Sequence, residues 1–363
     1  MKSDKRRYSK EGCYAGKYRR KYGRKYRRRR VGMLVLLPIL LSAVILSVHQ
    51  TGIEPMHLMQ KFFAGIEKLE QLGTAGFHGG VFGGERKHTD ENNLEVHFLD
   101  IGQGDATLLK CGEYAMLIDT GEVGKGTAIQ YYLMKQGITQ LDYLVLTHPD
   151  SDHIGSADVI LTKFKVDQVL LTDYEKDNSV YGKLVEALTY QRIEPVIVRS
   201  EAVSDQESDR ASDQQFQTGS SFSLGTAVCT ILGPVNVYED PNNSSIALLV
   251  EHGKNRFLFT GDAESMAEAD ILEYCQVNQI SIQANVYKAG HHGSSTSSGD
   301  DFLDAVAPKV TVISCGVDND YGHPHEETMK RFRDRGIQVF RTDEQGTVVA
   351  VSDGEQVMWE VEW

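Results

Sequence analysis

One short apolar run in this sequence ends in a cluster of ionisable side chains. Residues 141–146 read Leu-Asp-Tyr-Leu-Val-Leu, and the chain continues as Thr-His-Pro-Asp-Ser-Asp-His. A short apolar run bounded by turn residues is typical of a buried strand. In open α/β sheets, binding sites lie at the edge where such strands end. The sequence places four ionisable side chains there: His148, Asp150, Asp152 and His153.

These four side chains have the chemistry of metal ligands. Neutral imidazole and ionised carboxylate both bind divalent cations. The alternating positions 148, 150 and 152, with 153 added, allow a tight loop to direct several donors to one point. The alternative is a polar turn between a strand and a helix that binds nothing. A metal site is favoured because other predicted strands end in the same way.

Three further strand ends carry His or Asp. The apolar run 256–260 is followed by Gly-Asp262, and residues 285–288 lead to the pair His291-His292. Asp262 also precedes a predicted helix, where an Asp often serves as the N-cap. Its position at a strand end favours a ligand. His323, after the strand 310–314, is predicted either to cap a helix or to reach the site.

Carboxylates earlier in the chain are predicted to support the site. Asp119 ends the strand 114–118, and we expect it to hold a ligand His or a loop amide rather than to bind metal itself. Asp105 ends the loop 100–105, which contains two glycines. That loop joins strand to strand and lacks the helix that a dinucleotide-binding fingerprint requires.

The net charge of −13 is unevenly distributed. Residues 1–30 contain 15 Lys and Arg and two acids, a local charge of +13, and residues 31–363 contain 23 basic and 49 acidic residues, or −26. Residues 31–48 carry no charged side chain and are long enough to cross a bilayer. Basic residues flanking a span stay in the cytoplasm, which predicts a catalytic part outside it.

This pattern predicts four segments: a basic cytoplasmic tail (1–30), a transmembrane signal anchor (31–49), a stalk or linker (50–92) and one folded domain (93–363). A cleaved signal peptide is the alternative, but its charged region would be unusually long and no Ala-x-Ala site follows. The tail could also bind nucleic acid. Beside a membrane span, attraction to anionic lipid is the simpler interpretation.

The folded part alternates predicted strands and helices, as layered α/β folds do. Residues 200–218, rich in Ser, Asp and Gln, are predicted to form a surface loop or a lid over the site. The four cysteines of this part are Cys111, Cys229, Cys275 and Cys315. Although an exported domain could form two disulfides, a chain this long can bury enough core without them, so we expect buried thiols.

The motifs, in this order, resemble the metallo-β-lactamase superfamily, and within it the hydrolase domain of the ComEC competence DNA-uptake proteins and the phosphorylcholine esterases. The motifs are 100–105 (Asp-Ile-Gly-Gln-Gly-Asp), 117–121 (Leu-Ile-Asp-Thr-Gly), 148–153, 242–245 (Asn-Asn-Ser-Ser), 260–262 (Thr-Gly-Asp), 291–294 (His-His-Gly-Ser) and 322–324 (Gly-His-Pro). The resemblance extends over residues 94–351. It implies an α/β fold, an αββα sandwich with a two-metal site at one edge.

The resemblance also implies roles for individual residues. One cation would be bound by His148 and Asp150, the second by Asp152, His153 and one histidine of the pair His291/His292, and Asp262 would lie between them. His291 is the preferred ligand of the pair. Asp152 would also orient the attacking hydroxide, while His292 or His323 would protonate the leaving oxygen or contact phosphate. The implied supporting or substrate-binding residues are Asp105, Asp119, Asn243 and Ser294.

Two departures from the wider superfamily affect the metal. Asp150 stands where a second His is usual, and the Asn243 segment replaces a further His ligand. Both are normal in the ComEC-like branch. Because oxygen donors make a site harder, Mn²⁺ becomes a rival to Zn²⁺ for the two positions.

The implied function is a membrane-anchored, extracytoplasmic phosphodiesterase or nuclease linked to DNA uptake or extracellular DNA turnover. The acidic domain offers no obvious basic surface for tight nucleic-acid binding, although local lysines such as Lys288 could contact phosphate. One alternative is a cell-surface phosphorylcholine esterase or another small-molecule hydrolase. The alternative from a different class is a surface binding module with a degenerate metal site.

Overall fold

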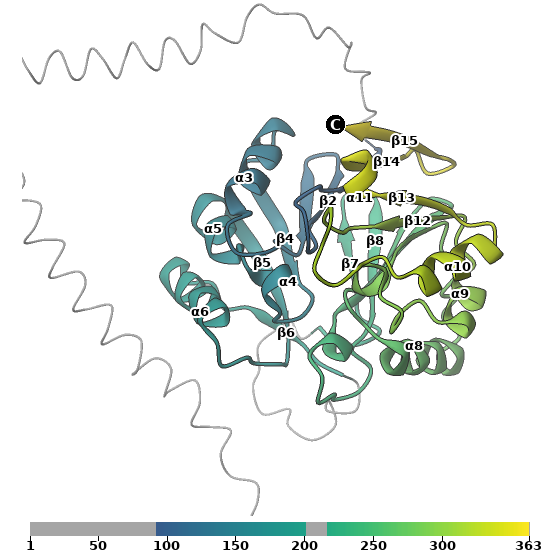
Figure 1. Cartoon of the computed structure of the whole chain (residues 1–363). Coiled ribbons are helices and arrows are strands. Elements are labelled where there is room, and N and C mark those ends of the chain that lie inside the picture. The colour runs from purple at the N-terminus through teal and green to yellow at the C-terminus, as the bar shows by residue number, and fades with distance from the viewer. Residues whose placement is uncertain (1–91, 201–215, 363) are drawn as a thin grey trace, which may run out of the picture. The chain divides into compact units, whose positions relative to one another are not determined.

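The computed structural model describes residues 92–200 and 216–362. Two β-sheets pack face to face, and helices cover the outer face of each sheet (Figure 1). This four-layer arrangement confirms the predicted αββα sandwich. The predicted tail, membrane anchor and nearly all of the stalk lie outside the described residues, as does most of the polar insertion 200–218. Within 92–200 and 216–362, no helix is both long and apolar enough to cross a bilayer.

The first sheet contains eight strands in the order β15-β14-β1-β2-β3-β4-β5-β6. Strands β3 to β6 run parallel, and the others pair antiparallel. The strand bounds are β1 Leu94–Phe98, β2 Thr107–Cys111, β3 Tyr114–Ile118, β4 Gln140–Leu146, β5 Lys165–Thr172, β6 Val196–Val198, β14 Thr347–Ser352 and β15 Val357–Glu362.

The second sheet contains seven strands in the order β13-β12-β11-β10-β9-β8-β7. Here β10 to β13 run parallel, and β7 to β10 pair antiparallel. The strand bounds are β7 Ser221–Leu224, β8 Ala227–Gly233, β9 Ala247–His252, β10 Asn255–Phe259, β11 Val286–Lys288, β12 Val310–Ile313 and β13 Gln338–Arg341.

Helices flank the two sheets on opposite sides (Figure 1). Three longer helices cover the first sheet: α3 Gly126–Lys135, α5 Ala157–Lys163 and α6 Ser179–Gln191. Three more cover the second: α8 Ser265–Val277, α9 Asp300–Val306 and α10 Glu326–Asp334. The remaining helices are short: α4 Ser151–Ile154, α11 Thr342–Gln345, and the 3₁₀ turns η2 Asn242–Ser244 and η3 Gly290–Gly293.

Strand β3 shows why the central strands are apolar throughout. Met116 and Ile118 belong to the core between the sheets, whereas Ala115 and Leu117 belong to the core beneath the helices. Successive side chains of a strand point to opposite faces, so a strand covered on both faces needs apolar residues at every position. The four predicted buried thiols are unpaired and buried in these cores, which confirms that prediction.

The parallel strands bring distant segments to one edge. The segments after β4, β10 and β11 leave the sheets at their carboxyl ends, where parallel strands finish together. A backbone hydrogen bond joins the two sheets there: Ile246 N donates to Thr147 O at 2.9 Å. A second bond, from Asp105 N to Asp152 O at 3.1 Å, joins two loops of the first sheet. The fold therefore assembles one site from segments more than 180 residues apart in sequence.

Candidate metal centre

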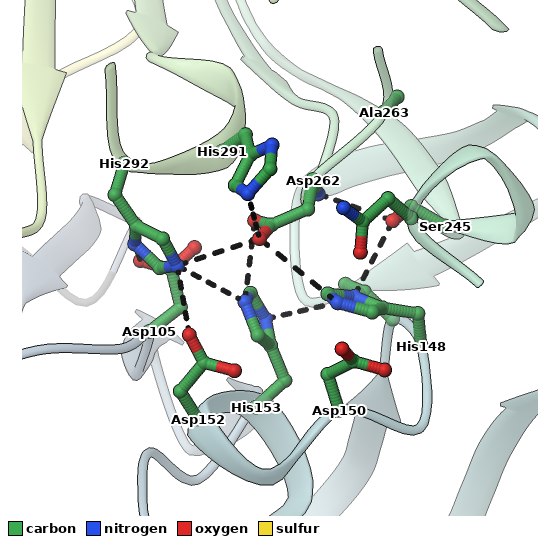
Figure 2. A network of polar contacts seen from close by, with 12 residues as sticks. Asp105, His148, Asp150, Asp152, His153, Ser245, Asp262, Ala263, His291 and His292 are labelled. Carbon is green, nitrogen blue, oxygen red and sulfur yellow. Dashed lines mark hydrogen bonds and ion pairs between the residues drawn. The ribbon is translucent and has the colours of Figure 1, made fainter. Parts of the chain in front are cut away.

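Four buried side chains from four segments converge at this edge (Figure 2). Asp105, His153, Asp262 and His292 each offer one ligand atom, and these atoms lie within 4.8 Å of one another. His153 lies in α4, directly after β4. Asp262 lies in the turn after β10, and His292 lies in η3 after β11. The group is a candidate for holding a metal ion.

His292 lies at the middle of the polar contacts. Its Nε2 is 3.3 Å from Asp152 Oδ2, 3.4 Å from Asp262 Oδ2 and 3.3 Å from His153 Nε2. Figure 2 shows these contacts between His292 and its neighbours. Its other nitrogen, Nδ1, is 3.0 Å from the carbonyl oxygen of Ser314, to which it can donate a proton. That bond would leave the Nε2 lone pair directed at the carboxylates, which is how proteins orient a ligating imidazole.

His148 supplies a direct test of whether a cation fits. Its Nε2 is buried and has no hydrogen-bond partner among the described residues. A carboxylate oxygen of Asp262 lies 4.0 Å away. Burial, together with the positive charge of His153, lowers the pKa of His148 well below its usual value, so this imidazole is neutral. A neutral, unpaired imidazole nitrogen facing a carboxylate is a donor that a divalent cation would complete.

Charge balance at the centre gives the same result. Burial would lower the pKa of His153, but the charges of Asp262 and Asp119 raise it well above its usual value. For His292, burial likewise opposes the carboxylates of Asp262 and Asp105, which raise its pKa to about 10. Burial would raise the pKa of Asp262, yet the two imidazoles lower it. Acidic oxygens this buried require positive charge, and a metal ion supplies it by replacing imidazole protons.

Asp119 supports His153 from behind. It accepts hydrogen bonds from Thr147 N at 2.8 Å and Thr147 Oγ at 2.7 Å, and its Oδ2 lies 2.8 Å from His153 Nδ1. Three contacts fix the carboxylate, and through it the plane of the imidazole. Such a carboxylate behind a His orients the ring and raises its basicity.

Asp105 occupies the corresponding position behind His292. Its Oδ1 lies 3.6 Å from His292 Nδ1, and its Oδ2 accepts a hydrogen bond from Lys288 Nζ at 2.7 Å. A Cβ at Gly104 would lie 2.4 Å from Asp152 O, so glycine is needed for this close approach. Lys288 is 3% exposed and bonded to Asp105. It cannot contact phosphate at the surface, and that part of the sequence interpretation was wrong.

The paired histidines point in different directions. His291 is part-exposed, its Nδ1 lies 3.3 Å from Glu264 and 3.2 Å from Thr296 Oγ1, and its Nε2 is 3.7 Å from Asp262. The geometry therefore favours His292 as the ligand, in place of the predicted His291. Both residues have positive φ, 49° and 54°, which residues with a side chain rarely adopt. Such backbone strain clusters at functional sites.

Asp150 differs from the other predicted ligands because it is already paired. Its Oδ1 accepts a hydrogen bond from Lys176 Nζ at 2.7 Å, and the carboxylate is 30% exposed. Lys176 lies in the loop between β5 and α6. The structure thus brings Asp150 to the rim of the site (Figure 2), where it can exchange a lysine for a cation.

His323 lies at the outer side of the centre. Its ring stacks on that of His292 with 6.0 Å between centroids, and its Nδ1 is buried without a hydrogen-bond partner among the described residues. Burial and the neighbouring histidines His292 and His291 lower the pKa of His323 to about 4. It is therefore neutral at neutral pH, and it reaches the site rather than capping a helix.

Asn243 and Ser294, implied by the resemblance as supporting or substrate-binding residues, make contacts of the supporting kind. Asn243 Oδ1 accepts hydrogen bonds from Glu264 N and Ala267 N at the start of α8. Ser294 Oγ bonds to Thr296 within its own loop. Both hold the segments from which Asp262 and His292 emerge.

Sequence reasoning missed Lys176 and gave Ser245 no role of its own. Ser245 Oγ accepts a hydrogen bond from Asp262 N at 3.1 Å and lies 3.4 Å from His148 Nδ1. It is the last residue of the motif 242–245, so its position was a usable signal. The sequence carried no signal for Lys176, because its pairing with Asp150 spans 26 residues.

Comparison with known proteins agrees with this geometry. The family model described as the metallo-beta-lactamase superfamily matches residues 99–208 and 232–317. The matched ranges contain all six predicted ligand positions.

Curated relatives are competence and recombination proteins. ComE operon protein 3 of Bacillus subtilis is 32% identical over 276 residues, covering 70% of this chain and 32% of that protein. Recombination protein 2 of Haemophilus influenzae is 31% identical over 252 residues, covering 68% of this chain and 27% of that protein. Competence protein ComA of Neisseria gonorrhoeae is 31% identical over 261 residues, with 71% and 32% covered. The chain spans about a third of the length of these relatives.

Proposed function

The chain belongs to the metallo-beta-lactamase superfamily, and from that premise we propose that it hydrolyses phosphodiester bonds with two bound divalent cations. One observation carries the proposal: the buried side chains of Asp105, His153, Asp262 and His292 present ligand atoms within 4.8 Å of one another. A surface binding module with a degenerate site would have no reason to keep so many buried ionisable groups together.

The residues divide between two positions. His148 and Asp150 would hold one cation and His153, Asp152 and His292 the other, with Asp262 between them. When bound, two such cations lower the pKa of a water molecule and stabilise the charge on phosphoryl oxygens.

The protein's own groups would position the reactants. Asp152 lies 21% exposed between the buried centre and solvent, so its carboxylate can orient an attacking water. His323 is neutral, and its ring stacks on that of His292 at the centre. A neutral imidazole can donate a hydrogen bond to the phosphate or the leaving oxygen from one ring nitrogen.

The substrate we propose is a nucleic acid. Two of the relatives are named Recombination protein 2 and Competence protein ComA, and recombination is a reaction of DNA. No thiolate lies among the described ligand candidates, and oxygen-rich two-metal sites are common in nucleases. A phosphorylcholine ester is the competing substrate. The experiment below distinguishes it from a nucleic acid.

A substrate panel tests the proposal. The purified full-length chain, loaded with Mn²⁺ or Zn²⁺, is incubated with single-stranded DNA, RNA, a cyclic dinucleotide, p-nitrophenyl phosphorylcholine and a β-lactam. We expect cleavage of DNA that excess EDTA abolishes and added metal restores. Exclusive cleavage of the phosphorylcholine ester would replace the nuclease assignment, and bound metal far below one ion per chain with no cleavage would favour the binding module.

We also propose that the catalytic part lies outside the cytoplasm. The reason is the charge of +13 in residues 1–30 directly before the apolar residues 31–48. Protease added to intact protoplasts should digest an epitope tag at the carboxyl terminus and spare one at the amino terminus. Protection of the carboxyl-terminal tag, with digestion after lysis as the control, would contradict this topology.

A further inference from the structure

The loop between β12 and α10 forms a rim beside the metal centre and exposes two large apolar side chains. Val317 is 69% exposed and Tyr321 is 62% exposed. The same loop continues into His323, which packs against His292. The exposed ring of Tyr321 is two residues from His323. It is therefore presented where a substrate would lie.

This loop is held by side-chain hydrogen bonds. Asn319 Nδ2 donates to Gly316 O at 2.9 Å and to His323 O at 2.6 Å, while its Oδ1 accepts from His323 N at 3.0 Å. Gly316 N donates to Gln103 Oε1 at 3.2 Å, which fixes the loop to the first sheet. The backbone that carries Tyr321 is therefore preorganised, and a ligand that used this ring would not have to order it.

The rings form a stack that leads from the centre to solvent. The Tyr321 ring stacks on His323 with 5.6 Å between centroids and 19° between planes. His323 in turn stacks on His292 with 6.0 Å and 27°. One face of Tyr321 is covered by His323, and its exposure leaves the other free to take up a ligand.

We propose that Tyr321 is the stacking platform for a nucleobase of the nucleotide whose phosphodiester lies at the metal centre. The inference rests on the proposed function and names the part of the substrate that sets its specificity. Base stacking on an aromatic ring accepts every base because each has a π face. The ring would thus favour nucleic acid without selecting a sequence.

The surroundings favour a base over the other groups a phosphoester can carry. A phosphate belongs at the cations, whereas a neutral base needs an aromatic face on which to stack. A quaternary ammonium such as choline is recognised by cages of several rings. Tyr321 offers one ring face.

Matched variants and substrates test the platform. The full-length chain and its Tyr321→Ala, Tyr321→Trp and Tyr131→Ala variants are loaded with Mn²⁺. Tyr131 lies on α3 and is 67% exposed, which makes it the control for loss of a surface tyrosine. Binding of a fluorescent, phosphorothioate-linked oligothymidylate and of an abasic oligomer of equal length is measured by anisotropy. Cleavage of the phosphodiester forms is measured alongside.

We expect Tyr321→Ala to weaken oligothymidylate binding by about 5- to 150-fold, the range that stacking of one base supplies. Binding of the abasic oligomer should change less than about twofold, Tyr321→Trp should retain oligothymidylate binding, and Tyr131→Ala should behave as wild type. Equal losses on both oligomers would overturn the inference while leaving phosphodiester hydrolysis intact. The inference would also be overturned if Tyr321→Ala lowered the cleavage of p-nitrophenyl phosphorylcholine more than it weakened oligothymidylate binding. The ring would then be assigned to the choline cation.

The same measurements separate this inference from the proposed function. If the wild-type chain cleaves no phosphodiester yet binds oligothymidylate through Tyr321, hydrolysis is refuted and the platform stands. If it cleaves DNA and Tyr321→Ala leaves base-dependent binding unchanged, the platform is refuted alone. If it neither cleaves nor binds, both are refuted.

Discussion

Replacing His292 with glutamine or alanine is expected to lower the affinity for a divalent cation by more than about 100-fold. Loss of a residue that only hydrogen-bonds to a metal ligand already lowers metal affinity about 10- to 100-fold. His292 is 1% exposed, and its Nε2 lies within 3.4 Å of both Asp152 and Asp262. Turnover should fall with metal content. His291→Ala should change metal affinity less than about tenfold, because His291 faces Glu264 and Thr296.

Metal titration of the purified variants, with content checked by elemental mass spectrometry, decides between the two histidines. Glutamine is the primary substitution because it is uncharged, polar and similar in size to the imidazole, and thermal unfolding confirms that the variant is folded. His291→Ala is the matched control, one residue away on the same strained turn. Metal loss in His291→Ala with normal binding in His292→Gln would restore the assignment made from sequence.

The adjacent histidines show where sequence reasoning ends. That a pair of imidazoles follows β11 was readable from the chain, because an apolar run and a Gly/Ser loop bound it. Which ring turns inward depends on left-handed backbone angles at both positions and on the Ser314 carbonyl, which β12 brings from 22 residues away. Nothing local distinguishes two neighbouring residues of the same type.

The fold was more predictable than the site for the same reason. Strand β3 is apolar at nearly every position because it faces two cores, and that pattern is local. The environment of Lys288, in contrast, is not set by its neighbours in the sequence. A lysine at the end of an exposed-looking motif is buried against Asp105, 183 residues earlier, because Gly104 permits a close approach. Pairings between segments decide which charged side chains reach solvent.

Removal of metal from the full-length chain is expected to abolish hydrolysis, and Mn²⁺ is expected to restore more activity than Zn²⁺. Three carboxylates (Asp150, Asp152 and Asp262) face three imidazoles (His148, His153 and His292), and the described cysteines are buried in the cores. Carboxylate and water ligands suit Mn²⁺, whereas Zn²⁺ prefers imidazole and thiolate. A rate advantage of about tenfold would correspond to about 1.4 kcal/mol of activation free energy.

Asp150 is the position at which this preference can be changed. Its carboxylate pairs with Lys176 at the rim, so it is the predicted ligand least constrained by the buried network. Asp150→His should shift the ratio of Mn²⁺ to Zn²⁺ activity toward Zn²⁺, and Asp167→Asn, on the exposed part of β5, should leave it unchanged. Rates are measured on metal-stripped protein titrated with each ion, since Zn²⁺ binds more tightly than Mn²⁺ at almost any such site and protein from cells can carry it in a less active form. Activity with Zn²⁺ alone in both the parent and Asp150→His would show that ligand hardness does not govern this centre.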